Sequence, residues 1–171
     1  MSFQAILQGT PTWVWVLLVF LLSRGVKALK GGTAPLSRLA LVPAIFAVWG
    51  ATHLLTDPFA SWAAALAWLA AVCAGIAGGL HLARRSGFSV DPVARTVTLP
   101  GSAVPLVLIV VIFAAKFWLG VAHATVTDAA AHAQYATLGA AVSGVVAGIF
   151  AGRFLSYVQA MRNAVTPLAQ S

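Results

Sequence analysis

The sequence predicts an all-α integral membrane protein with five transmembrane helices, its N-terminus outside the membrane and its C-terminus inside. Three observations support this fold class. The 171 residues are 61% hydrophobic and only 8% charged, with a mean hydropathy of +0.95, which exceeds what the core of a soluble domain requires. Five apolar runs have about the length that crosses ~30 Å of hydrocarbon. Basic residues also follow alternate runs, as the positive-inside rule requires.

The five apolar runs follow one another with short connections, so we expect one polytopic domain over residues 1–171. The predicted helices cover residues 11–29, 39–56, 58–83, 103–124 and 129–155.

Capping residues stand at several of the predicted helix starts. Proline at the first helical position follows a favoured N-cap at residues 10–11 and again at 57–58. Asp128 or Thr127 can cap the fifth predicted helix in the same way, while Ser37 and Ser102 are candidate caps for the second and fourth.

The distribution of cations fixes the predicted orientation. Nine of the ten basic residues lie in the first connection, the third connection and the C-terminal segment: Arg24, Lys27, Lys30, Arg38, Arg84, Arg85, Arg95, Arg153 and Arg162. The N-terminal tail and the other two connections carry none, so these segments are expected outside. Because the cations flank apolar runs and form no soluble basic patch, we expect the lipid bilayer as a partner and no nucleic acid.

The third connection is long enough to fold. A turn signal at Asp91 and Pro92 precedes alternating polar and apolar residues from Thr96 to Leu99. We therefore predict a short cytoplasmic β-hairpin at about residues 86–100, between the third and fourth helices.

The fifth predicted helix contains a row of small residues. Gly144, Gly148 and Gly152 are spaced by four, which places them on one helix face and lets another backbone approach closely. Gly75, Gly78 and Gly79 of the third helix offer one surface for this contact. The row could instead hold a homo-oligomer or a membrane protein partner, and the sequence leaves both possibilities open.

Lys116 is the tenth basic residue and lies inside the fourth apolar run. A charge at this depth costs roughly 2.5 to 3.5 kcal/mol on insertion scales, and such residues usually face a protein interior or a cavity. Snorkelling towards the outer interface is the structural alternative. We treat Lys116 as a candidate intramembrane site together with His123 on the same helix face and His53 at a similar level.

Other polar residues gather on the outer side. His53, His123, Asp128 and His132 include imidazole and carboxylate groups that could ligate a transition metal or conduct protons. No HExxH motif is present, however, and Asp128 already has a role as a helix cap. We assign no resident cofactor.

Two stretches resemble a known family. The Pro-Thr-Trp-Val-Trp start at residues 11–15, the Pro-Gly-Ser segment at 100–102 and Lys116 beside Phe117 are similar to elements of a family of small bacterial inner-membrane proteins, a domain of unknown function. This resemblance covers nearly the whole chain. It implies a helical, multi-pass protein of the bacterial inner membrane and implies no activity.

Two functional hypotheses follow. The chain has three acidic residues and no hydrolase or nucleotide-binding motif, so we expect no enzyme activity. The first hypothesis is a non-enzymatic accessory or self-associating membrane component. The alternative is a small transport or sensing protein that binds an anion, proton or metal through Lys116 and the outer His and Asp residues.

Overall fold

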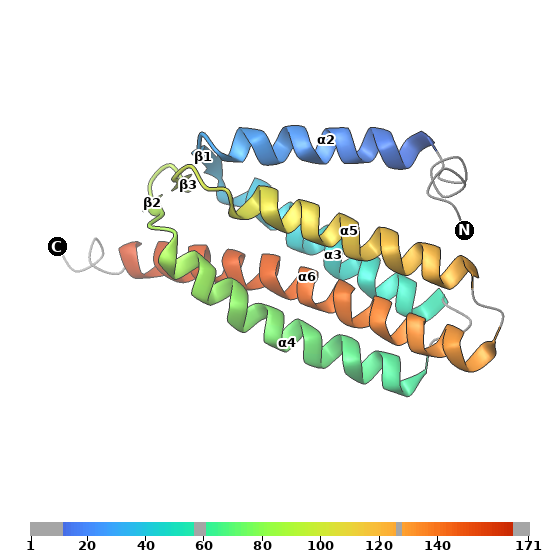
Figure 1. Ribbon diagram of the computed structural model, residues 1–171. Helices are drawn as coiled ribbons and strands as arrows, with labels where there is room; N and C mark the ends of the chain where they lie inside the picture. The colour runs from blue at the N-terminus through green and yellow to red at the C-terminus, as the bar shows by residue number, and fades with distance from the viewer. Residues whose placement is uncertain (1–11, 57–60, 126–127, 166–171) are drawn as a thin grey trace.

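In the described part of the chain, five helices lie lengthwise beside one another, with three short strands at one end (Figure 1). The computed structural model describes the backbone of residues 12–56, 61–125 and 128–165. The elements are α2 (Thr12–Ala28), β1 (Gly32–Pro35), α3 (Leu36–Thr56), α4 (Trp62–Arg85), β2 (Ser89–Asp91), β3 (Thr96–Leu99), α5 (Val104–Thr125) and α6 (Ala129–Val165).

Three helices in the described ranges are long and apolar enough to cross a membrane. They are α4, α5 and α6, while α3 is apolar over the shorter stretch Leu36–Thr52. The chain is therefore helical and has the composition of a membrane protein.

The closest contact in the bundle joins α4 to α6. A Cβ added to Gly75 of α4 would lie 2.5 Å from the Val145 carbonyl oxygen and 2.9 Å from the Gly148 Cα. A Cβ added to Gly144 of α6 would lie 2.5 Å from the Trp68 carbonyl oxygen. The two backbones thus touch where both helices lack side chains, which is the packing available when no hydrophobic force drives helices together within a membrane.

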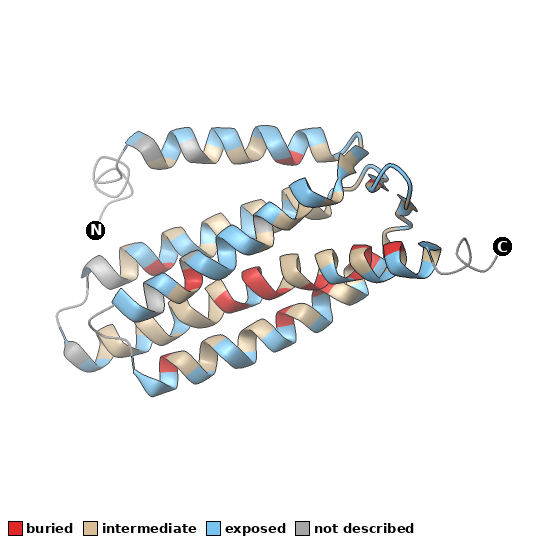
Figure 2. Cartoon of the chain, turned by 180° about the vertical axis from the view of Figure 1, so that it is seen from behind, coloured by how far each residue is buried: buried red, intermediate tan, exposed pale blue. Residues whose placement is uncertain are grey.

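The glycine row of α6 is occupied by α4 of the same chain. Gly79 and Gly152 continue the contact, whereas a Cβ at Gly78 would meet no atom within 4 Å. A second copy of the chain would need a different face. Figure 2 shows buried residues gathered along α6 and few on α2. On its other side α6 meets α3, where the rings of Phe46 and Phe150 stack with centroids 5.3 Å apart.

The strands form a three-stranded antiparallel sheet in the order β1-β3-β2. Its turn is held by the Asp91 carboxylate, which accepts hydrogen bonds from the backbone N–H of Val93 (2.9 Å) and Ala94 (3.0 Å). The sequence predicted only the β2–β3 pair. The third strand was missed because Gly31 before it and Gly32 at its start are typical of a turn.

The sheet packs on the ends of the helices. Val97 of β3 is fully buried in a cluster with Ala83, Tyr157 and Met161. The ring of Phe88 meets Tyr157 edge to face at 4.8 Å. This contact explains why α6 continues to Val165, ten residues beyond the predicted end at 155, since its last turns bury apolar side chains against the sheet.

The starts of two helices also differ from the prediction. Helix α3 begins at Leu36 and not at residue 39, so Ser37 lies inside its first turn and is not its cap. Its start is fixed by the sheet, because the Leu36 N–H donates to the Arg95 carbonyl at 3.0 Å. Helix α4 begins at Trp62, where the Ser61 hydroxyl accepts from the Ala64 N–H at 3.3 Å. The predicted caps at residues 10–11 and 57–58 lie outside the described residues.

Ser102 and Asp128 are confirmed as caps, while the alternative cap Thr127 lies outside the described residues. The Ser102 hydroxyl accepts a hydrogen bond from the Val104 N–H at 3.2 Å, at the start of α5. The Asp128 carboxylate accepts from the Ala131 N–H at 3.1 Å, at the start of α6.

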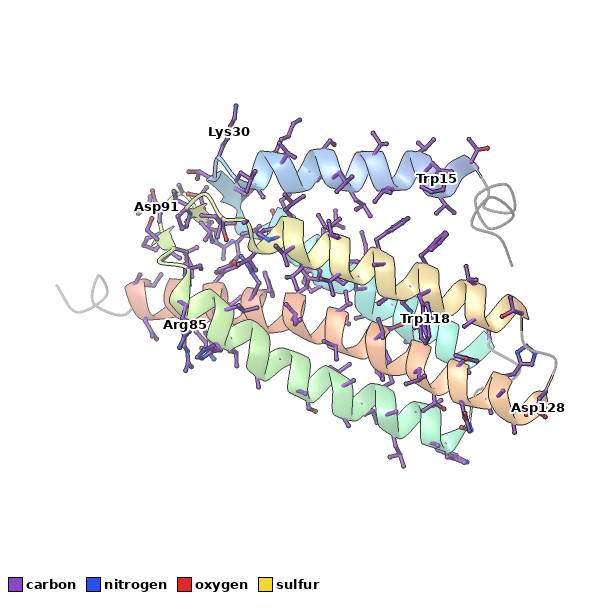
Figure 3. The ribbon with its side chains drawn as sticks, in the orientation of Figure 1. Trp15, Lys30, Arg85, Asp91, Trp118 and Asp128 are labelled. Atoms are coloured by element: carbon purple, nitrogen blue, oxygen red, sulfur yellow. The ribbon has the colours of Figure 1, made fainter. Side chains whose placement is uncertain are left out.

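Cationic residues gather at the sheet end of the bundle. The ends of α2 and α4 and the start of α3 meet there, with Lys27, Arg84, Arg85 and Arg38. Figure 3 places Lys30 and Arg85 near the sheet, and Trp15, Trp118 and Asp128 towards the opposite half. The fold therefore separates the cations of the sheet end from Trp15, Trp118 and Asp128.

We predict that Gly148→Ala destabilises the protein by about 1 to 3 kcal/mol, because the new methyl group would lie 2.8 Å from the Gly75 Cα. The matched control is Gly78→Ala in α4, where a Cβ meets no atom within 4 Å and alanine gains up to ~1 kcal/mol of helix propensity. Thermal unfolding midpoints in mild detergent compare the two. Equal midpoints for both variants would contradict the backbone contact.

Candidate functional site

Lys116 lies near the middle of α5. It stands twelve residues after Val104 and nine before Thr125, which is about 18 Å and about 13 Å along the helix axis at ~1.5 Å per residue. Helix α5 has the highest mean hydropathy of the three long apolar helices, 2.4. The apolar surroundings of Lys116 therefore raise the free energy of a charge at this position.

The ammonium group bonds to the neighbouring helix. Lys116 Nζ donates to the Ser143 hydroxyl at 2.7 Å and to the Gly139 carbonyl oxygen at 3.1 Å, both on α6. The Ser143 hydroxyl itself donates to the Gly139 carbonyl at 2.8 Å. The three groups form a closed hydrogen-bonded triangle that ties α5 to α6. We call Lys116, Gly139 and Ser143 the lysine triangle.

Open space lies beside the lysine triangle. Gly120 is one turn from Lys116 on the same helix face, and both residues are exposed. A Cβ at Gly120, or at Gly139 across the contact, would meet no atom within 4 Å. Lys116 is therefore bonded to α6 on one side, and open space adjoins the contact at Gly120 and Gly139.

Aromatic side chains flank the lysine triangle on both neighbouring helices. Trp118 meets Tyr135 of α6 nearly edge to face at 6.2 Å, and Leu119 is buried. On the other side of α5, the ring of Phe117 lies 6.4 Å from that of Trp15 in α2. These contacts hold α5 between α2 and α6, yet only 6% of its most apolar stretch is buried, against 22% for α4 and 28% for α6.

The structure describes only part of the predicted outer site of histidine and aspartate residues. His53 lies in α3 and His123 in α5, and their side chains lie outside the described part of the structure. Asp128 caps α6, and its carbonyl oxygen accepts from the His132 N–H at 3.1 Å. Within the described residues, no group of three or more His, Cys, Asp or Glu side chains could hold a metal ion.

Sequence reasoning identified Lys116 but missed its two acceptors. Gly139 and Ser143 are spaced by four in an apolar helix, so they share one face. A hydroxyl among apolar residues is a usable signal for a membrane contact. The sequence could not show which helix would reach it.

The two stretches that carry the family resemblance meet in space. Trp15 and Phe117 are in contact, and the Ser102 N–H donates to the Ala28 carbonyl at 3.0 Å where α2 ends and α5 begins. A family model described as a family of unknown function, DUF6622, matches residues 2–166. The chain belongs to this family. The resemblance to a domain of unknown function is thereby confirmed, and no curated protein or solved structure matches the chain.

We predict that Ser143→Ala lowers stability by about 0.6 to 1.7 kcal/mol, because it removes one acceptor of the Lys116 ammonium. Thr137→Val is the matched control, since the Thr137 hydroxyl donates to the Ala133 carbonyl of its own helix at 2.9 Å. Unfolding by a graded ratio of denaturing to mild detergent measures both. A loss that is no larger for Ser143→Ala than for Thr137→Val would show that the lysine triangle does not stabilise the bundle.

Proposed function

We propose that the chain is a non-enzymatic accessory component of the bacterial inner membrane that acts by associating with another membrane protein. One observation supports this function above the others. The most apolar long helix, α5, is also the least buried, and it carries an exposed lysine near its middle. Hydrocarbon is a poor environment for an ammonium group, whereas a protein partner can cover it.

The proposed arrangement has five spans, with the N-terminus outside and the C-terminus inside. Support comes from the cations at the sheet end, which the positive-inside rule assigns to the cytoplasm. In this arrangement the three-stranded sheet lies at the cytoplasmic surface, and its basic rim faces anionic lipid headgroups. Asp128 and the start of α6 then lie on the outer side.

The alternative function is binding of an anion, proton or metal. The positive charge of Lys116 favours an anion over a metal, because a cation would be repelled. In the described part of the chain, no carboxylate approaches Lys116, and the Asp128 carboxylate is engaged as a cap. Association has the broader support, because it also accounts for the apolar surface that α5 leaves unburied, which anion binding does not.

The topology predicts opposite labelling of the two ends. In a Cys73→Ala background, Ala130→Cys at the start of α6 should react with a membrane-impermeant maleimide on intact cells. Ala94→Cys in the turn of the sheet should react only after permeabilisation, because it is expected in the cytoplasm. Both positions are exposed, so exposure does not distinguish them. The reverse labelling pattern would overturn the orientation.

Association predicts a cross-linked adduct at the lysine face of α5. In the same background, Gly120→Cys with a short sulfhydryl-reactive photocrosslinker in native membranes should give one adduct of defined mass above the 17.6 kDa chain. The control is Ala77→Cys, an exposed position of α4 that also lies in the span. A chain that stays at 17.6 kDa, or equal diffuse products from both positions, would count against association.

A further inference from the structure

We propose that Lys116 docks a transmembrane helix of a different protein, and that this helix carries an aspartate or glutamate at the depth of the ammonium. The inference rests on the proposed function and names the chemistry of the partner. It follows from the unused donor of the ammonium, the placement of the acidic residues, the depth of Lys116 and the open space beside it.

The ammonium has capacity for another acceptor. A lysine ammonium has three N–H donors, and two of them bond within the lysine triangle. No third acceptor is present among the described residues. Both acceptors are neutral, so the positive charge itself has no counter-ion there.

The chain cannot supply that counter-ion from within its own spans. Its three acidic residues are all aspartates. Asp91 holds the turn of the sheet, Asp128 caps α6, and Asp57 directly follows the last residue of α3 in the sequence. A second copy would bring another lysine to the same face and repel the first. The countercharge therefore belongs to a different protein or to another anion.

The depth of Lys116 selects a helix over a lipid or a solute. The residue lies about 18 Å and about 13 Å from the two ends of α5. A lipid carboxylate stays at the interface because its head group keeps its hydration, and a dissolved anion would have to leave water entirely. A spanning helix carries its side chains to this depth as part of its insertion.

The open space fits the approach of a helix. Exposed Gly120 lies one turn from Lys116, and neither Gly120 nor Gly139 has an atom within 4 Å of its added Cβ. Small residues beside a polar group let a second backbone come close enough to form an interhelical hydrogen bond. The lysine and these two glycines form the proposed docking surface.

The test uses a defined probe. The full chain, dye-labelled at Ala130→Cys in the Cys73→Ala background, is reconstituted into phosphatidylcholine vesicles. It is titrated with synthetic Leu/Ala transmembrane peptides of about 20 residues that carry one central Asp, Asn or Leu. Energy transfer should show the Asp peptide binding about five- to thirtyfold more tightly than the Asn peptide. Lys116→Arg should keep this preference, and Lys116→Met should lose it.

Three results would overturn the inference. The first is equal binding of the Asp and Asn peptides to the chain that keeps Lys116. The second is a preference for the Asp peptide that survives Lys116→Met. The third is release of the Asp peptide by oleate at equal membrane concentration. The first result concerns the peptides alone, so it does not depend on the folding of a variant. The third would assign the site to a lipid carboxylate.

A parallel measurement separates this inference from the proposed function. If the native-membrane adduct forms equally well with Lys116→Met, association stands and the carboxylate partner is wrong. If the natural chain forms no adduct in native membranes, the proposed function fails whatever the peptides show.

Discussion

The bundle depends on the contact between the backbones of α4 and α6. Helices in a membrane gain nothing from leaving water, so they must associate through packing and polar contacts. Gly75 lies against Gly148, while Gly79, Gly144 and Gly152 lie against other backbone atoms of the opposite helix, and neither helix could approach as closely if these residues carried side chains. Helix α6 then offers its remaining faces to α3 and α5, and its last turns support the sheet.

Polar contacts supplement the limited packing of α5. This helix buries little of its apolar surface, so its position depends on a few contacts along its length. At the sheet end, Ser102 bonds to Ala28 and the segment after β3 lies against the end of α2. Near its middle, the Lys116 ammonium reaches Gly139 and Ser143. The lysine that would make this helix costly to place in hydrocarbon thus also bonds it to α6.

The sequence predicts the elements of this fold better than their contacts. Hydropathy and caps place the helices, because both are properties of consecutive residues. The end of α6 was missed since hydropathy falls after residue 155, yet the Arg153 side chain bonds the Tyr157 hydroxyl and Tyr157 is buried against the sheet. The glycine spacing identifies a close-packing face but not its partner. Likewise, the sequence shows that Lys116 is an unusual charge in an apolar helix. It does not show the acceptors of Lys116, because they lie more than twenty residues away in another helix.

The geometry of the lysine triangle decides how a partner would affect the fold. A carboxylate that used the third N–H of Lys116 would leave the bonds to Gly139 and Ser143 in place. Partner binding would then add to the α5–α6 contact and would not compete with it. Because coupling between two binding events is reciprocal, a chain whose α5 is already held on α6 would also bind the partner more tightly. Ser143 would then have a second role, because its bond to the ammonium would set the depth and orientation at which another helix could reach Lys116.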